Sequence, residues 1–94
     1  MKTFLIQRNL PGAGNLTLAE RKAIAIKSCA VINELGRENI QWLYSYVTSD
    51  NLWCVYRAEN EEFIKEHAKK GSFPCDNVRE VFATFSPETA EVVI

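Results

Sequence analysis

Hydrophobic and polar positions along the chain divide it into six segments, four with a strand pattern and two with a helix pattern. The strand-like segments are short and rich in β-branched and aromatic residues, and they cover residues 3–8, 40–48, 52–58 and 77–85. The helix-like segments cover residues 17–36 and 60–70, and residues 86–94 form a tail. The order β-α-β-β-α-β predicts a ferredoxin-like α+β fold. We expect a single domain of residues 1–94, with a four-stranded antiparallel sheet and both helices on one face.

Both predicted helices carry signals at their ends. Thr17 and Glu20 fit a capping box, in which each side chain binds the other residue's main-chain N–H. Asn60 fits the cap of the second helix, and Gly36 and Gly71 fit the stops of the two helices. The first helix is expected to bury one hydrophobic stripe, made of Leu18, Ala25, Ile26, Cys29, Val31 and Ile32.

Hydrophobic residues occupy both faces of the predicted strands. On the second strand Ile40, Trp42, Tyr44 and Tyr46 point one way, and Leu43 and Val47 point the other. On the third strand Leu52, Cys54 and Tyr56 oppose Trp53 and Val55. A sheet with one face in water should alternate apolar and polar residues, so the face without helices needs a cover. A second copy of the chain is the simplest cover, and the pattern therefore predicts a homodimer of the α/β-barrel type.

Composition narrows the range of partners. Eleven basic and twelve acidic residues give a net charge of −1, which supplies no field for nucleic acid or anionic lipid. The apolar runs are too short to span a membrane. The three cysteines, Cys29, Cys54 and Cys75, form no CxxC pair, so reduced thiols in a cytoplasmic protein are expected. We therefore expect neither a nucleic-acid nor a membrane partner.

The one histidine, His67, falls on the apolar face of the second helix with Phe63 and Ile64. The helix runs back along the third strand, and its rise places His67 roughly over Cys54. Tyr46, Cys54 and Tyr56 are then the nearest candidate partners. Their orientation depends on the hairpin register, which "TSDN" does not fix. An inward histidine is either a hydrogen-bonded core residue or a functional group.

Three stretches, "RNLPGAGNLT", "WLYSYVTSDNLWCVYRA" and "EEFIKEHAKKGSFP", resemble the small nickel-binding-protein family, which is largely catalogued as a domain of unknown function. The resemblance covers nearly the whole chain. It implies a ferredoxin-like fold in a dimeric α/β barrel, and Ni²⁺ binding in some members. It agrees with the fold and the dimer expected from the residue pattern.

Two classes of function follow. The first is a metal-binding protein, with nickel or another divalent transition metal held by His67 and by Tyr46, Tyr56 or Cys54. The second is a small-molecule binder or enzyme of the dimeric α/β-barrel type, similar to the barrel-forming monooxygenases, with an aromatic cavity and His67 as proton handler. Metal binding ranks slightly first, on resemblance more than on chemistry.

Overall fold

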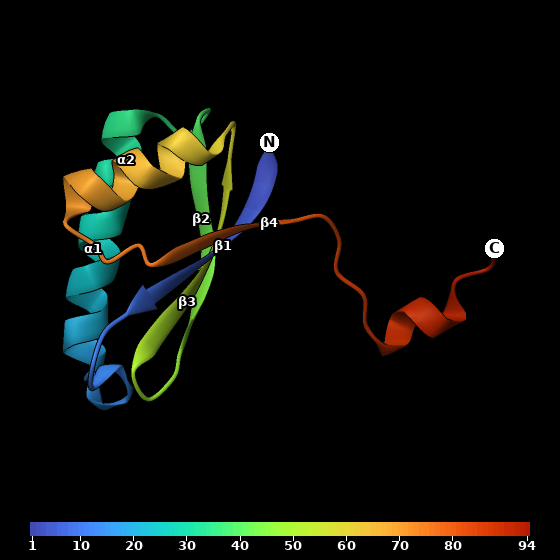
Figure 1. Ribbon diagram of the computed structural model, residues 1–94, viewed down its shortest axis with the longest axis horizontal. Helices are drawn as coiled ribbons and strands as arrows, with labels where there is room; N and C mark the ends of the chain where they lie inside the picture. Colours follow the sequence, from blue (N-terminus) through green and yellow to red (C-terminus); the bar gives the residue numbers. More distant parts are fainter.

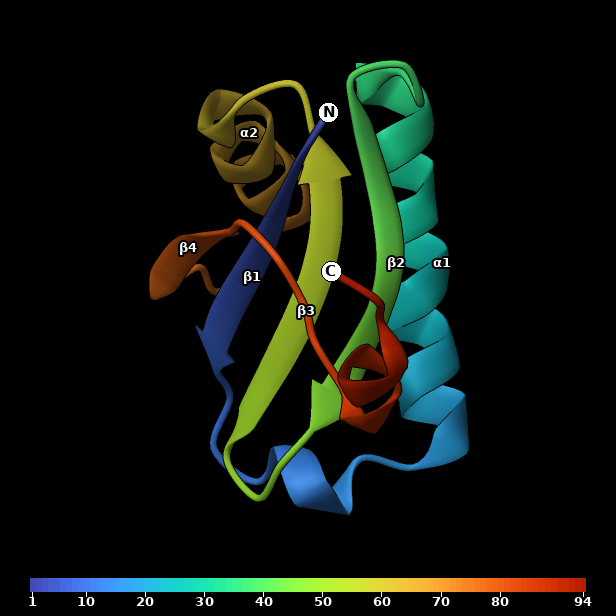
Figure 2. The same cartoon turned by 90° about the vertical axis from the view of Figure 1, so that its right-hand side faces the viewer.

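The computed structural model describes residues 1–94 as one antiparallel sheet with two α-helices on one side. The elements are β1 (Lys2–Asn9), α1 (Leu18–Leu35), β2 (Ile40–Val47), β3 (Asn51–Ala58), α2 (Glu61–Gly71) and β4 (Asn77–Val81), with short 3₁₀ helices η1 (Ala13–Asn15) and η2 (Pro87–Glu91). The strand order is β2-β3-β1-β4. Figure 1 shows the sheet nearly edge-on with both helices on its left, and Figure 2 looks onto the face without helices. The predicted ferredoxin-like α+β fold is confirmed.

The predicted capping box at the start of α1 is present. The Thr17 hydroxyl accepts from the Glu20 main-chain N–H at 3.1 Å, and the Glu20 carboxylate accepts from the Thr17 N–H at 2.9 Å. The hydrogen bond from the Thr17 main chain also lowers the pKa of Glu20. Gly36 follows the last turn with φ 96°, a conformation that favours glycine. The helix therefore begins and ends where the sequence indicates.

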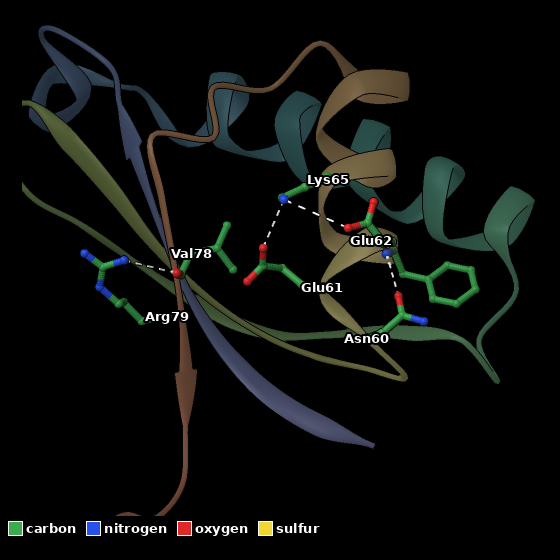
Figure 3. A network of polar contacts seen from close by, with 7 residues as sticks. Asn60, Glu61, Glu62, Lys65, Val78 and Arg79 are labelled. Carbon is green, nitrogen blue, oxygen red and sulfur yellow. Dashed lines mark hydrogen bonds and ion pairs between the residues drawn. The ribbon is translucent and has the colours of Figure 1, made fainter.

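Polar side chains fix the start of α2, and Figure 3 shows their contacts. The Asn60 side chain accepts from the Phe63 main-chain N–H at 3.3 Å. Lys65 lies 3.1 Å from Glu61 and 4.0 Å from Glu62, and all three side chains are largely exposed. These carboxylates therefore belong to a solvated first turn of the helix.

The buried face of α1 differs in part from the predicted stripe. Val31 and Ile32 are buried and Ala25 is half-buried, as expected, but Leu18, Ile26 and Cys29 are exposed. The face toward the sheet instead follows a spacing of three or four residues, which includes a serine: Ile24, Ala25, Ser28, Val31, Ile32 and Leu35. A helix face predicted from hydrophobic residues alone omits Ser28, although its side chain is buried with an exposed fraction of 3%.

A β-bulge in β2 changes which side chains face the helices. Trp42 pairs with Tyr56, but the next pair is Tyr44 with Val55, so Leu43 is an extra residue. Beyond the bulge, the side chains of β2 change faces. The predicted common face of Trp42, Tyr44 and Tyr46 is therefore wrong, since only Trp42 shares a face with Tyr56.

The last strand is shorter than residues 77–85. Its ladder with β1 ends at the pair Thr3 and Val81, one residue from the start of β1 at Lys2. The following residues form an arm that leaves the sheet on the helix-free side (Figure 1). Phe82 and Phe85 on this arm are 87% and 89% exposed.

The hydrophobic core fills the space between the helices and the sheet. Its members are Phe4, Ile6, Ala13, Ile32, Ile40, Leu52, Cys54, Tyr56, Ala58 and Ile64. All three cysteines are free. No helix in the structure combines the length and the hydrophobicity needed to cross a membrane.

Candidate functional site

His67 lies on the inner face of α2, at one end of a buried chain of polar side chains. Its side chain is 1% exposed, and its Nε2 atom lies 3.0 Å from the Ser28 hydroxyl of α1. That hydroxyl lies 3.1 Å from the Tyr56 hydroxyl of β3. One hydrogen-bonded path thus joins α2, α1 and the sheet.

Aromatic rings enclose this polar chain. The Phe73 ring stacks on the His67 imidazole at 5.3 Å and 17°, and the Tyr56 ring lies 5.0 Å away at 60°. Trp42 stacks on Tyr56 at 6.3 Å. Gly71 makes the position of Phe73 attainable, because a Cβ atom at Gly71 would lie 2.3 Å from the ring.

A buried arginine stands beside these rings. Arg8 is 2% exposed, and its Nη1 atom donates to the Pro74 carbonyl at 2.6 Å. Its guanidinium carbon lies 5.3 Å from the Phe73 ring centre and 5.8 Å from that of Tyr56. Cation–π contacts of this kind stabilise a desolvated guanidinium. The arginine thus ties β1 to the loop after α2.

Burial and the charge of Arg8 keep the imidazole neutral. Burial, followed by the positive charge of Arg8, lowers the pKa of His67 from 6.5 to about 4, while the contact with Ser28 acts more weakly in the opposite direction. Burial also raises the pKa of Tyr56, against the hydrogen bond from Ser28 and the charge of Arg8. At neutral pH the site therefore contains a neutral imidazole, a neutral phenol and a guanidinium cation.

A cavity of about 340 Å³ opens beside this cluster, between the first half of α1 and the sheet. We call it the α1–sheet cavity. Ten of its fifteen lining residues are hydrophobic, and its polar or aromatic walls include Arg8, Ser28, Trp42, Ser45, Tyr56 and Phe73. The bulge at Leu43 allows Trp42 and Ser45 both to line it, and the Trp42 indole N–H donates to the Ser45 hydroxyl at 3.0 Å. His67 does not line the cavity, but it contacts the lining residue Ser28.

The structure brings together some of the predicted site residues and separates one. Tyr56 contacts His67 directly, and Cys54 is buried on the same face of β3. Tyr46 is not part of this cluster. It lies on the helix-free face, 61% exposed, with its ring 5.5 Å from Tyr44. The expectation that Tyr46 lies near His67 is wrong, because the bulge reverses its direction.

The chemistry of the His67 cluster does not fit a nickel ion. The Nε2 atom of His67 already contacts Ser28, and the Arg8 charge that opposes a proton on the imidazole equally opposes a divalent cation. The raised pKa of Tyr56 disfavours the phenolate that a metal would need. No three His, Cys, Asp or Glu side chains of the chain form a group that could hold a metal.

Sequence reasoning missed two residues of this cluster, Arg8 and Ser28. Arg8 could have been found, because Phe4, Ile6 and Arg8 alternate along β1 and must share a face. Ser28 lies three residues after Ala25 and four before Ile32, in the helical stripe. A buried histidine needs a polar partner, and that requirement points to such a serine.

One family model and one solved structure are similar to this chain. The family model described as nickel responsive protein SCO4226-like matches residues 4–81. The crystal structure of SCO4226 from Streptomyces coelicolor A3(2) superposes with a TM-score of 0.74 at 15% identity, over 88% of this chain and 99% of that one. At this identity the superposition speaks for the fold alone. No curated protein matches the sequence significantly. From the family match, the chain belongs to the SCO4226-like nickel-responsive proteins.

Proposed function

We propose that this nickel-responsive family member works as a binding protein for a small organic molecule, which it takes up in the α1–sheet cavity. One observation carries the proposal: a mainly hydrophobic cavity of about 340 Å³ with a few polar groups converging on it. Binding sites for small molecules typically combine these features, and volumes of about 300–1,000 Å³ are usual.

The side chains that line the cavity offer different kinds of contact to a bound molecule. Trp42 and Phe73 offer flat apolar surfaces, and Ser28 and Tyr56 offer hydroxyl groups. His67 is absent from the lining and acts as a positioning residue, because its contact with Ser28 fixes where that hydroxyl points. The neutral imidazole thus supports recognition.

A cavity-filling substitution tests the proposal. Ala25 lines the cavity, whereas the next residue, Ile26, is 60% exposed and does not line it. We expect 2-naphthoate or 2-naphthamide to shift the NMR indole signal of Trp42, and Ala25→Trp to abolish this shift while Ile26→Trp keeps it. The proposal is wrong if neither probe shifts the signal, or if both variants bind as the wild type does.

Nickel binding at His67, with Cys54 and Tyr56 as partners, is the second candidate, and the family description favours it. The Arg8 charge disfavours it. Calorimetry with NiCl₂, on protein purified without an affinity tag, tests whether His67 is a nickel ligand. We expect His67→Ala to leave any stoichiometric nickel binding unchanged. Loss of that binding in a folded His67→Ala protein would instead establish His67 as a ligand.

We further propose that the protein is a homodimer in the cytoplasm. The helix-free face carries exposed Tyr44 and Tyr46 and half-buried Trp53 and Val55 (Figure 2 views this face). An uncovered apolar sheet face of this kind typically marks an interface. The arm after β4 projects on the same side and is positioned to contact a second copy. Three free cysteines agree with a reducing compartment.

A further inference from the structure

Arg8 is a buried cation without an acidic partner. Its guanidinium carries five N–H donors, yet its side chain makes one hydrogen bond, from Nη1 to the Pro74 carbonyl. The three ion pairs of the structure all lie on other residues. Burying an unpaired charge is unfavourable, and the two cation–π contacts, to Tyr56 and Phe73, offset only part of this cost. An anion in the cavity would therefore give the Arg8 guanidinium the partner that it lacks.

The charge of the cavity lining points the same way. Every charged residue that lines the α1–sheet cavity is basic: Arg8 in its wall, and Arg21 and Lys22 from the start of α1. No aspartate or glutamate lines it, although the chain has twelve acidic and eleven basic residues. A low-dielectric cavity with charges of one sign attracts ligands of the other sign. The expected ligand is therefore negatively charged.

Hydroxyl groups add hydrogen-bond donors to the cavity lining. The Ser45 hydroxyl accepts from the Trp42 indole, which leaves its own proton free to donate. Ser28 and Tyr56 also line the cavity. A planar guanidinium fork matches a carboxylate, and a singly charged carboxylate costs less to desolvate in a largely hydrophobic cavity than a doubly charged phosphate. The largely hydrophobic remainder of the lining requires an apolar body.

We propose that the α1–sheet cavity binds a monocarboxylate with an apolar, ring-containing body, whose carboxylate pairs with Arg8. The ring system lies against Trp42 and the apolar face of α1. This inference rests on the proposed function, since it names the chemical class of the ligand for the same cavity. The alternative is that Arg8 only anchors the loop at Pro74.

The test compares two probes of the same shape, 2-naphthoate and its neutral amide 2-naphthamide, on the full-length protein. In the wild type we expect the carboxylate to bind about tenfold or more tightly than the amide, because a charge-assisted hydrogen-bond pair is stronger than a neutral one. Arg8→Gln should bring the two affinities to the same level, and Arg8→Lys should keep part of the difference. Lys2→Gln is the matched control and should change nothing, because Lys2 is an exposed basic residue of the same strand that lies outside the cavity.

Arg8→Gln could unfold the protein, so a second variant keeps the proposal testable. Arg21 and Lys22 are exposed, and their double change to glutamine should reduce the preference for 2-naphthoate and weaken its dependence on salt. Equal affinity of both probes for the wild type overturns the carboxylate proposal and leaves the proposed function standing. If neither probe binds in the cavity, both are overturned. An unchanged preference in folded Arg8→Gln protein assigns Arg8 to anchoring alone.

Discussion

His67 shows how one buried side chain makes stability depend on pH. Its imidazole stays neutral in the folded protein down to a pKa of about 4, whereas in the unfolded chain it takes up a proton near pH 6.5. The unfolded state therefore binds more protons between these values, and the folded state loses stability as the pH falls from 6.5 toward 4. Burial raises the pKa of the neighbouring Tyr56 on β3, so the phenol stays neutral in this window, and the positive charge of Arg8 on β1 opposes the proton on the imidazole.

We expect the free energy of unfolding to be about 1 to 2 kcal/mol lower at pH 5 than at pH 7 because of His67 alone. Urea titrations at a series of pH values measure this slope. His67→Gln is the control, because the chain has no other histidine and the variant keeps every carboxylate. The same slope in both proteins would mean that His67 is protonated equally in the folded and unfolded states.

Single residues of the site were the hardest part to predict from the sequence. The helical period correctly placed His67 on an inward face, and strand alternation placed Cys54 and Tyr56 on one face of β3, from which Tyr56 contacts His67. Tyr46 failed because a single extra residue, Leu43, reverses every side chain after it, and no local pattern signals a bulge. The same bulge places Ser45 in the cavity lining. The misplacement of Tyr46 and the presence of Ser45 in the cavity therefore both follow from the extra residue Leu43.

At the scale of elements, local sequence signals were sufficient to predict the helix starts, because a cap forms between residues that are neighbours in the chain. The capping box at Thr17 and the asparagine cap at Asn60 are present, and both helices begin as predicted. The predicted strand 77–85 was too long, because its pairing with β1 stops at Val81, opposite Thr3 near the start of β1. Element type thus follows from the sequence, whereas the end of an edge strand follows from its neighbour.

The end of α2 yields a paired prediction. Gly71 was expected as the helix stop, but the left-handed residue is Ser72, with φ 54°. Gly71 is instead a helical residue where a Cβ atom would collide with the Phe73 ring. Gly71→Ala should therefore destabilise the protein by about 1–3 kcal/mol through overpacking against the ring that stacks on His67.

The neighbouring change has the opposite sign. Ser72→Gly should stabilise the protein by about 0.5–1 kcal/mol, because glycine adopts the left-handed conformation without a Cβ penalty. Thermal and urea unfolding of the two variants side by side measure both effects. If Gly71→Ala were neutral and Ser72→Gly destabilising, the described geometry of this turn would be wrong.

At the scale of the whole molecule, the two faces of the sheet differ in what covers them. The helix-covered face contains the core, the polar chain around His67 and the α1–sheet cavity. The helix-free face, which Figure 2 views, carries the exposed side chains of Tyr44 and Tyr46. Because the two faces do not overlap, assembly through one face leaves the cavity on the other accessible. Ligand binding and dimer formation are therefore expected to be separable by mutation.

The dimer itself is tested on the full-length chain. Light scattering after size exclusion should give twice the chain mass of 10.7 kDa, since burial of the apolar sheet face favours association. Tyr46→Lys should shift the protein toward the monomer, because a lysine desolvated in an apolar interface is costly. Ile26→Lys is the matched control, since Ile26 is 60% exposed against 61% for Tyr46 but lies on α1. A wild-type monomer at micromolar concentration, or equal dissociation by both variants, would contradict an interface on the helix-free face.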